Sequence, residues 1–172
     1  MTVEFRLLQP SDDRSQFSSG NIELDRFFQR YAGQNQFKHY VGSTYVLCLE
    51  EKIAGFATVS AGEICAENLD ERLKKRLPDY PLPILRIARL AVDKNYQGLG
   101  LGKKLLRACF ELALNMKKHY GCIGVVVDAK AESVAFYEKL GFIALPTLSG
   151  ELGEKPQPET LFLAIQSIEK AL

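Results

Sequence analysis

The chain has 172 residues, of which 47% are hydrophobic and 25% charged, a composition typical of a single soluble globular domain over residues 1–172. The 22 Lys and Arg residues nearly balance the 21 Asp and Glu residues, and the resulting charge of +1 argues against a protein that binds duplex DNA by itself. The sequence contains no run of about 18 apolar residues, so it predicts no membrane span, and the N-terminus lacks a secretion signal. We therefore expect a cytoplasmic protein without a membrane partner.

Cysteine and histidine residues exclude several enzyme classes. The 4 cysteines lie far apart without a C-x-x-C pair, and they predict free thiols in a reducing compartment. The only histidines, His39 and His119, belong to no H-E-x-x-H pattern, and the chain has no G-x-S-x-G motif. The sequence therefore predicts neither a metal site nor a serine hydrolase.

The first half of the chain predicts a strand, a helix and a hairpin. Residues 3–7 alternate between apolar and polar side chains, which is typical of a strand. Asn21 is a candidate N-cap for a helix. Residues 44–49 and 53–64 are rich in β-branched and aromatic side chains, and they predict two strands joined by a tight turn at Glu51-Lys52. The apolar side of the helix would consist of Ile22, Leu24, Phe27, Phe28 and Tyr31.

The middle of the chain predicts a short charged helix over residues 67–77, a strand over 84–92, a polar loop over 93–98 and a long helix over 99–120. Prolines end the short helix, and Gly121 ends the long one. The apolar stripe of the long helix consists of Leu105, Cys109, Leu112 and Met116.

The last third predicts, in order, a strand over residues 123–127, a helix over 132–140 with Gly141 as its C-cap, a strand over 142–145, a loop over 149–159 and a strand over 160–165. The full order of elements is β-α-ββ-α-β-α-β-α-β-β. It predicts a mixed α/β domain with a central sheet.

Residues 89–106 carry the most informative pattern. A predicted strand leads into a turn with Gly98, Gly100 and Gly102, and the turn opens the long amphipathic helix. Glycine lets backbone N–H groups approach an anion closely, and a helix N-terminus adds partial positive charge. The pattern therefore predicts a site for a phosphate or pyrophosphate.

Two common phosphate-binding motifs do not fit this turn. The motif G-x-x-x-x-G-K-[ST] would need a glycine at Gln97 and a hydroxyl residue at Lys104. The motif G-x-G-x-x-G fails because Lys103 and Leu105 occupy the positions of its third glycine.

The pattern Gln97-x-x-Gly100-x-Gly102 resembles the Q/R-x-x-G-x-G/A signature of the GNAT (GCN5-related) N-acetyltransferases. Residues 135–142, with the sequence AFYEKLGF, are similar to the helix-to-strand segment of the same family. The resemblance covers nearly the whole chain. It implies a central mixed, mostly antiparallel sheet of six to seven strands, flanked by helices and with splayed central strands.

The resemblance also implies the reaction, which moves the acetyl group of acetyl-CoA to a primary amine by direct attack and uses no metal. Tyr137 would be the general acid, because a tyrosine with a pKa of about 10 stays protonated at neutral pH and can donate a proton to the leaving thiolate. Ser133 and Phe136 would contact the cofactor, although Lys130 stands where many relatives have asparagine. The backbone of Leu90, Ala91 and Val92 would pair with the pantetheine arm, with the Val92 N–H on the thioester carbonyl. The pyrophosphate would lie on Gln97, Gly98, Leu99, Gly100, Leu101 and Gly102, with added charge from Lys103.

No general base stands out from the sequence. Glu63 and Asp93 are strand-end candidates. An acceptor whose amine has a pKa of about 7.7–8.0, such as an α-amino group, would hardly need one.

The N-terminal half is similar to the GNAT toxins of bacterial toxin–antitoxin modules, on residues 17–28, 44–46, 54–60 and 73–83, the last followed by residues 89–93. This resemblance implies acetylation of the α-amino group of aminoacyl-tRNA, a ribbon-helix-helix antitoxin as partner and a homodimer. Two alternatives stay open: an enzyme for a small amine or a protein N-terminus, and an inactive regulator that binds acyl-CoA. The cations for a tRNA-binding face would be Lys74, Lys75, Arg76, Lys103, Lys104, Lys117 and Lys118, with Arg86 and Arg89 near them in sequence; the alternative is that these residues form solvated helix faces.

Overall fold

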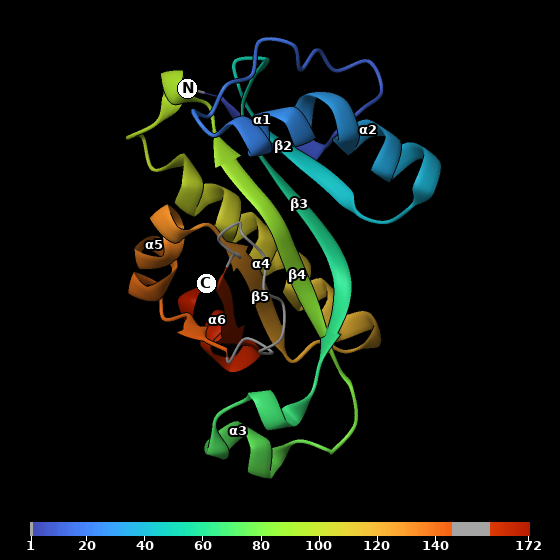
Figure 1. The fold of residues 1–172 in the computed structure, drawn as a ribbon, viewed down its shortest axis with the longest axis vertical. Helices are drawn as coiled ribbons and strands as arrows, with labels where there is room; N and C mark the ends of the chain where they lie inside the picture. Colours follow the sequence, from blue (N-terminus) through green and yellow to red (C-terminus); the bar gives the residue numbers. More distant parts are fainter. Residues whose placement is uncertain (1, 146–158) are drawn as a thin grey trace, which may run out of the picture. The chain divides into compact units, whose positions relative to one another are not determined.

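The computed structural model describes residues 2–145 and 159–172. They form two compact units, the first from Met1–Ser60 and Ile87–Glu111 and the second from Ala61–Arg86 and Leu112–Leu172. Three long elements run from one unit into the other (Figure 1): β3 (Lys52–Ile64), β4 (Leu82–Val92) and α4 (Leu101–Tyr120). The strands are hydrogen-bonded in the order β1-β2-β3-β4-β5-β7-β6, which confirms the predicted mixed α/β fold. The splayed strands and the single domain stay predictions.

In the first unit, β1 (Val3–Leu7) pairs antiparallel with β2 (Ser43–Leu49), and β2 pairs antiparallel with β3. The β2–β3 turn lies one residue earlier than predicted, because Leu49 pairs with Lys52 and leaves Glu50 and Glu51 as the two turn residues. A register shift between Leu47 and Cys48 sets this pairing, and the sequence gives no sign of it.

The helical segment that follows Asn21 is less regular than predicted. Asn21 caps α1 (Ile22–Arg26), and its side-chain oxygen accepts a hydrogen bond from the Leu24 N–H at 3.0 Å. Beyond α1 the segment continues through π-helical turns on both sides of α2 (Ala32–Gln34). A π-helical turn contains more residues than an α-helical one, so it shifts the apolar spacing at Tyr31, the last residue of the first such turn, but not at Ile22, which begins α1. Ile22 and Tyr31 are 73% and 43% exposed, and their predicted place on the apolar side was wrong.

Aromatic rings hold this helical segment on the sheet. Phe28 stacks on Phe56 of β3 with ring centroids 4.3 Å apart, and Phe17 meets Phe28 edge-on at 4.8 Å. Such contacts add about 0.5–1.5 kcal/mol each beyond the burial of area. The core of the first unit consists of Leu8, Phe17, Phe27, Phe28, Ala32, Val46, Cys48, Phe56 and Ala91.

In the second unit, β7 (Glu159–Ala164) pairs antiparallel with both β5 (Gly124–Ala129) and β6 (Ile143–Ala144). Gly124 permits the close pairing, because a Cβ there would overlap the Phe162 ring of β7. The core of this unit consists of Ala66, Leu69, Leu82, Ile84, Val126, Leu145 and Phe162.

The helices of the second unit are α3 (Glu71–Arg76), α5 (Val134–Lys139) and α6 (Ile165–Ala171). Asp70 caps α3, so the predicted charged helix begins later and is preceded by a 3-10 turn. The chain passes from β7 directly into α6 at Ile165. The sequence predicted a strand over residues 160–165 and no helix after it. The predicted loop over residues 149–159 lies outside the described residues except for its last position. Among the residues that the structure describes, no helix is long and apolar enough to cross a membrane.

Candidate functional site

Asp93 fixes the end of β4 within the first unit. Its backbone N–H donates to the Ala54 carbonyl at 2.8 Å, and its carboxylate accepts from the backbone N–H groups of Ser18 at 3.0 Å and Asn95 at 2.9 Å. The residue is only 4% exposed. A buried carboxylate that accepts two amide hydrogen bonds acts as an anchor for the backbone, and this arrangement gives no support to Asp93 as a base.

Gln97 anchors the glycine turn to the same segment. Its side-chain amide donates to the carbonyls of Ser19 and Val92, each at 3.0 Å. A third link runs from the Lys94 N–H to the Ser18 carbonyl at 2.8 Å. Ser18 and Ser19 therefore hold both ends of the loop that follows β4. Sequence reasoning did not identify these two serines, because they lie some 75 residues before the loop and their contacts use backbone atoms that no motif records.

The glycine turn presents open backbone at the start of a long helix. Gly98 and Gly100 have φ of +84° and +77°, and a Cβ built on either would meet no heavy atom within 4 Å. The Lys104 N–H donates to the Gly100 carbonyl at 3.3 Å, so the three N–H groups of residues 101–103 precede the first intrahelical bond. Lys103 is exposed at this end. Open amides at the N-terminus of a helix of 20 residues fit an anionic phosphate group.

Gly55 keeps the support of this turn closely packed. A Cβ at Gly55 would lie 2.9 Å from Cδ1 of Leu105 and 3.0 Å from the Ala91 carbonyl. The strand end and the first turns of α4 therefore approach β3 more closely than a side chain would allow. Within the segment predicted to hold the pantetheine arm, Ala91 is buried, and Leu90 and Val92 are half-buried.

Tyr137 lies in the second unit, on α5. It is 5% exposed, and its ring meets those of Phe136 and Phe142 edge-on at 5.1 and 5.4 Å. Gly141 ends the helix with φ of +98° and donates to the Glu138 carbonyl at 3.0 Å, as the sequence predicted. Ser133 stands at the N-cap position before α5, one step outside the helix.

The segments just described lie within the match to a known protein family. The family model described as "Acetyltransferase (GNAT) domain" matches this chain over residues 41–144, a stretch that contains both the glycine turn and α5. The chain belongs to the GNAT acetyltransferase family. It is therefore an acetyl-CoA-dependent N-acetyltransferase.

Known GNAT proteins resemble the chain over most of its length. A "tRNA-acetylating toxin" of Mycobacterium tuberculosis is 32% identical over 145 residues, which cover 83% of this chain and 85% of that protein. The toxin AtaT in complex with acetyl-methionyl-tRNAfMet superposes with a TM-score of 0.83, at 24% identity over 99% of each chain. A mutant of AtaT bound to the C-terminus of the antitoxin AtaR and acetyl-CoA gives a TM-score of 0.77, at 23% identity over 100% of this chain and 99% of that one.

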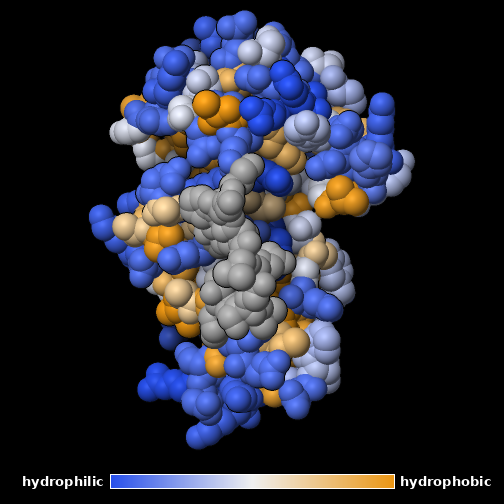
Figure 2. All heavy atoms as spheres, in the orientation of Figure 1, coloured by the Kyte–Doolittle hydropathy of each residue, from blue (hydrophilic) through white to orange (hydrophobic). Residues whose placement is uncertain are grey.

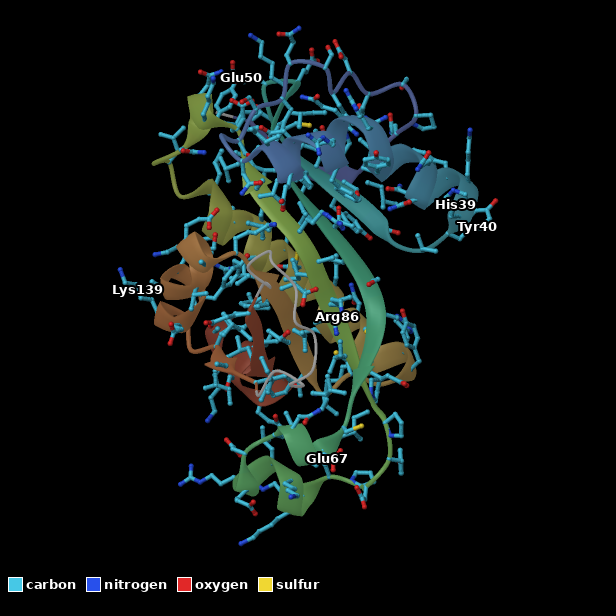
Figure 3. All side chains as sticks on the ribbon, viewed as in Figure 1. His39, Tyr40, Glu50, Glu67, Arg86 and Lys139 are labelled. Atoms are coloured by element: carbon cyan, nitrogen blue, oxygen red, sulfur yellow. The ribbon has the colours of Figure 1, made fainter. Side chains whose placement is uncertain are left out.

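Other candidate residues of this GNAT enzyme have structural partners inside their own units. Arg89 places its guanidinium 3.8 Å from the centre of the Phe27 ring, a cation–π contact. Arg86 (labelled in Figure 3) pairs with Asp128 at 2.7 Å, and Lys117 pairs with Glu169. Glu63 is exposed on β3. In the described part of the chain, no group of three or more His, Cys, Asp or Glu side chains could hold a metal ion.

Proposed function

We propose that the enzyme acetylates the α-amino group of aminoacyl-tRNA and acts as the toxin of a toxin–antitoxin module in the cytoplasm. The observation that carries this proposal is the 32% identity to a tRNA-acetylating toxin over 83% of the chain. The fold shared with AtaT, whose structure holds acetyl-methionyl-tRNAfMet, supports the same acceptor class.

The first unit supplies the groups that would hold acetyl-CoA. The open amides at Gly98, Gly100 and residues 101–103, with the exposed Lys103, would bind the pyrophosphate. The backbone of Leu90, Ala91 and Val92 would pair with the pantetheine arm, and the Val92 N–H would donate to the thioester carbonyl oxygen. The side chain of Gln97 would position the loop and would not contact the pyrophosphate, because its amide donates hydrogen bonds to the carbonyls of Ser19 and Val92.

Tyr137 of α5 would be the proton donor. Tyr137 is 5% exposed among aromatic rings, and a tyrosine hydroxyl, whose ordinary pKa is about 10, carries its proton at neutral pH. When the amine nitrogen bonds to the acetyl carbon and the carbon–sulfur bond breaks, its hydroxyl would give a proton to the leaving sulfur. The nitrogen would release a proton to solvent, from which the tyrosine would regain its own. Ser133 and Phe136 would contact the cofactor beside it.

The proposed acceptor would hardly need a general base. An α-amino group with a pKa of about 7.7–8.0 is partly neutral at physiological pH and can attack without help. A lysine side chain, with a pKa of about 10.4, would be almost fully protonated at that pH and could not attack without a base.

The partners would follow the same relatives. Exposed lysines of α4, among them Lys103 and Lys104, would contribute to a surface for tRNA phosphates, and binding there would weaken with salt. The AtaT structure with the C-terminus of AtaR supports an antitoxin as protein partner, for which we propose a ribbon-helix-helix protein. We also propose that the enzyme forms a homodimer.

The proposal is tested by offering labelled acetyl-CoA to a mixture of charged tRNAs, peptides and polyamines. We expect label in the charged tRNA fraction, and none when the aminoacyl-tRNA carries a formyl group on its α-amine. Uncharged tRNA serves as the matched control. Label confined to polyamines or peptides would replace the proposed acceptor with a small amine or a protein N-terminus, and no label at all would indicate an inactive binding protein.

The Tyr137→Phe variant tests the proton donor. We expect turnover to fall by about 10²–10⁴-fold with little change in acetyl-CoA affinity, because the hydroxyl acts on the leaving thiolate and not on cofactor binding. Tyr120→Phe is the control, since that tyrosine is 76% exposed at the end of α4. Full activity of Tyr137→Phe would assign proton transfer to another group.

A further inference from the structure

Asp25 of α1 binds the segment that precedes its own helix. Its Oδ1 atom accepts two hydrogen bonds from Ser19, one from the backbone N–H at 2.8 Å and one from the side-chain hydroxyl at 2.7 Å. The cap of α1 is Asn21, so the helix does not need Asp25 in order to begin. The effect of this carboxylate is on the position of Ser19.

Ser19 connects α1 to the loop that follows β4. Its carbonyl oxygen accepts the side-chain amide of Gln97 at 3.0 Å, and the same amide donates to the Val92 carbonyl at 3.0 Å. Gln97 directly precedes Gly98, the first glycine of the turn before α4. A continuous series of hydrogen bonds therefore leads from Asp25 through Ser19 and Gln97 to this turn.

Gly20 explains why Ser19 needs to be held from outside. It has φ of +93°, and a Cβ built on it would meet no heavy atom within 4 Å. A glycine without neighbours has wide conformational freedom, so the adjoining peptide group, which carries the Ser19 carbonyl, could rotate. The Ser19 hydroxyl also accepts the Asn21 N–H at 3.2 Å. Because Asp25 holds both the hydroxyl and the N–H of Ser19, it fixes the direction of the Ser19 carbonyl.

We propose that Asp25 is a positioning residue for acetyl-CoA binding, which acts through Ser19 and Gln97 to keep the turn at Gly98 and Gly100 in the shape that binds the pyrophosphate. This role rests on the proposed placement of the pyrophosphate at that turn. The negative charge of Asp25 has no part in it, because both hydrogen bonds need only an acceptor oxygen.

Loss of the contact between Asp25 and Ser19 should leave the protein folded. Both residues are half-buried, and the surface over α1 and α2 is mostly hydrophilic (Figure 2). Water can replace a hydrogen bond that is lost at such a place, so the effect on stability stays modest. The stacking of Phe28 on Phe56, which holds the helical segment on the sheet, involves neither residue.

The role is tested by calorimetric titration of Asp25→Ala with acetyl-CoA. We expect the affinity to fall about tenfold, with little change in Tm, because the turn loses its restraint. Asp25→Asn should restore nearly the wild-type affinity, since its amide oxygen can accept both bonds. Asp13→Ala is the matched control. That carboxylate accepts the same two groups from Ser15, at 3.0 and 2.7 Å, and among the described residues no hydrogen bond joins Ser15 to the loop after β4.

The double variant Asp25→Ala, Gln97→Ala separates one shared route from two independent effects. If Asp25 acts through Gln97, the double variant should also bind acetyl-CoA about tenfold more weakly than the wild type. Independent effects would multiply to about 100-fold. A loss of that size overturns the proposal, and so does unchanged affinity of Asp25→Ala or a failure of Asp25→Asn to restore binding.

Gly100→Asp distinguishes a failure of this role from a failure of the proposed cofactor site. If Gly100→Asp keeps its affinity for acetyl-CoA, the pyrophosphate lies elsewhere, and the role of Asp25 is overturned together with that site. If Gly100→Asp loses affinity while Asp25→Ala keeps it, the proposed cofactor site stands and the role of Asp25 alone is overturned.

Discussion

Among the turns of the first unit that enter the left-handed region of the backbone, two do so with different kinds of residue. In the β2–β3 turn, Glu50 and Glu51 have φ of +48° and +72°; Glu50 is labelled in Figure 3. In the turn before α4, the same region is occupied by Gly98 and Gly100. A residue with a Cβ costs about 1–2 kcal/mol in this conformation. The pairing of β2 with β3 offsets this cost at both Glu50 and Glu51. A positive φ alone therefore does not require glycine in this protein.

The reason for glycine before α4 lies in the space around it. A Cβ on Gly98 or Gly100 would meet no protein atom within 4 Å, in contrast to Gly55, where it would meet Leu105 and Ala91. Gly55 is needed for packing inside the protein, whereas Gly98 and Gly100 leave a backbone surface bare. Exposed amide groups at a helix N-terminus suit the binding of an anionic ligand. The comparison thus separates a turn that closes a hairpin from a turn that we propose to bind the pyrophosphate.

Gly100→Asp should break the second kind of turn most severely. The new carboxylate would occupy the amides at the start of α4, as aspartate does at N-caps, and would repel the pyrophosphate. We expect acetyl-CoA affinity to fall by about 100-fold or more, measured by calorimetry. Gly121→Asp, at the other end of α4 with φ of +99°, carries the same substitution and similar strain and should keep its affinity. Unchanged affinity of Gly100→Asp would move the phosphate site elsewhere.

Asp93→Ala should affect stability more than chemistry, because two backbone N–H groups would lose their acceptor in a buried place. We expect a loss of about 2 kcal/mol, which corresponds to a fall in Tm of about 6 °C. Asp13→Ala is the control, since that carboxylate accepts only from the neighbouring Ser15 at an exposed position. A loss of turnover without a fall in Tm would instead make Asp93 the general base.

Gln97→Ala should loosen the turn before α4 without altering its backbone. Two hydrogen bonds from the side chain to Ser19 and Val92 would be lost, each contributing about 1 kcal/mol when buried and less when exposed. We expect acetyl-CoA affinity to fall about tenfold, and the Tm to fall little. Gln34→Ala on α2 is an exposed control. If affinity is retained, the loop keeps its shape through Asp93 and Lys94 alone.

Features with a local cause could be predicted from the sequence. The cap at Asn21, the helix ends at Gly121 and Gly141 and the glycine turn each follow from a few neighbouring residues, and the structure has all of them. The pairing of residues 44–49 with residues 53–64 also follows, because both runs carry strand-forming side chains.

Features with a distant cause could not. The backbone N–H of Ser18 donates to the Asp93 carboxylate across 75 positions, and a backbone donor leaves no mark on the residue type. The π-helical turns that begin at Phe27 leave no sign in the residue types, and α6 begins at Ile165, an apolar residue that equally suits a strand. A pocket beside α3 is lined by residues between 70 and 76 and between 141 and 170, so its cations could be counted from the sequence but not placed.

Glu51→Gly should act on the other turn and in the opposite direction. Glycine removes the clash of a Cβ at φ of +72°, and the gain is partly offset by the greater freedom of glycine in the unfolded chain. We expect a net stabilisation of about 1 kcal/mol, seen as a rise in Tm of about 3 °C, with acetyl-CoA affinity unchanged. Glu111→Gly, at an exposed position inside α4, should lower the Tm by a similar amount, because glycine in a helix interior costs about 1 kcal/mol. If Glu51→Gly is neutral or destabilising, a contact of the glutamate side chain must offset the cost of its positive φ. That contact would then explain why the hairpin turn has glutamate at this position.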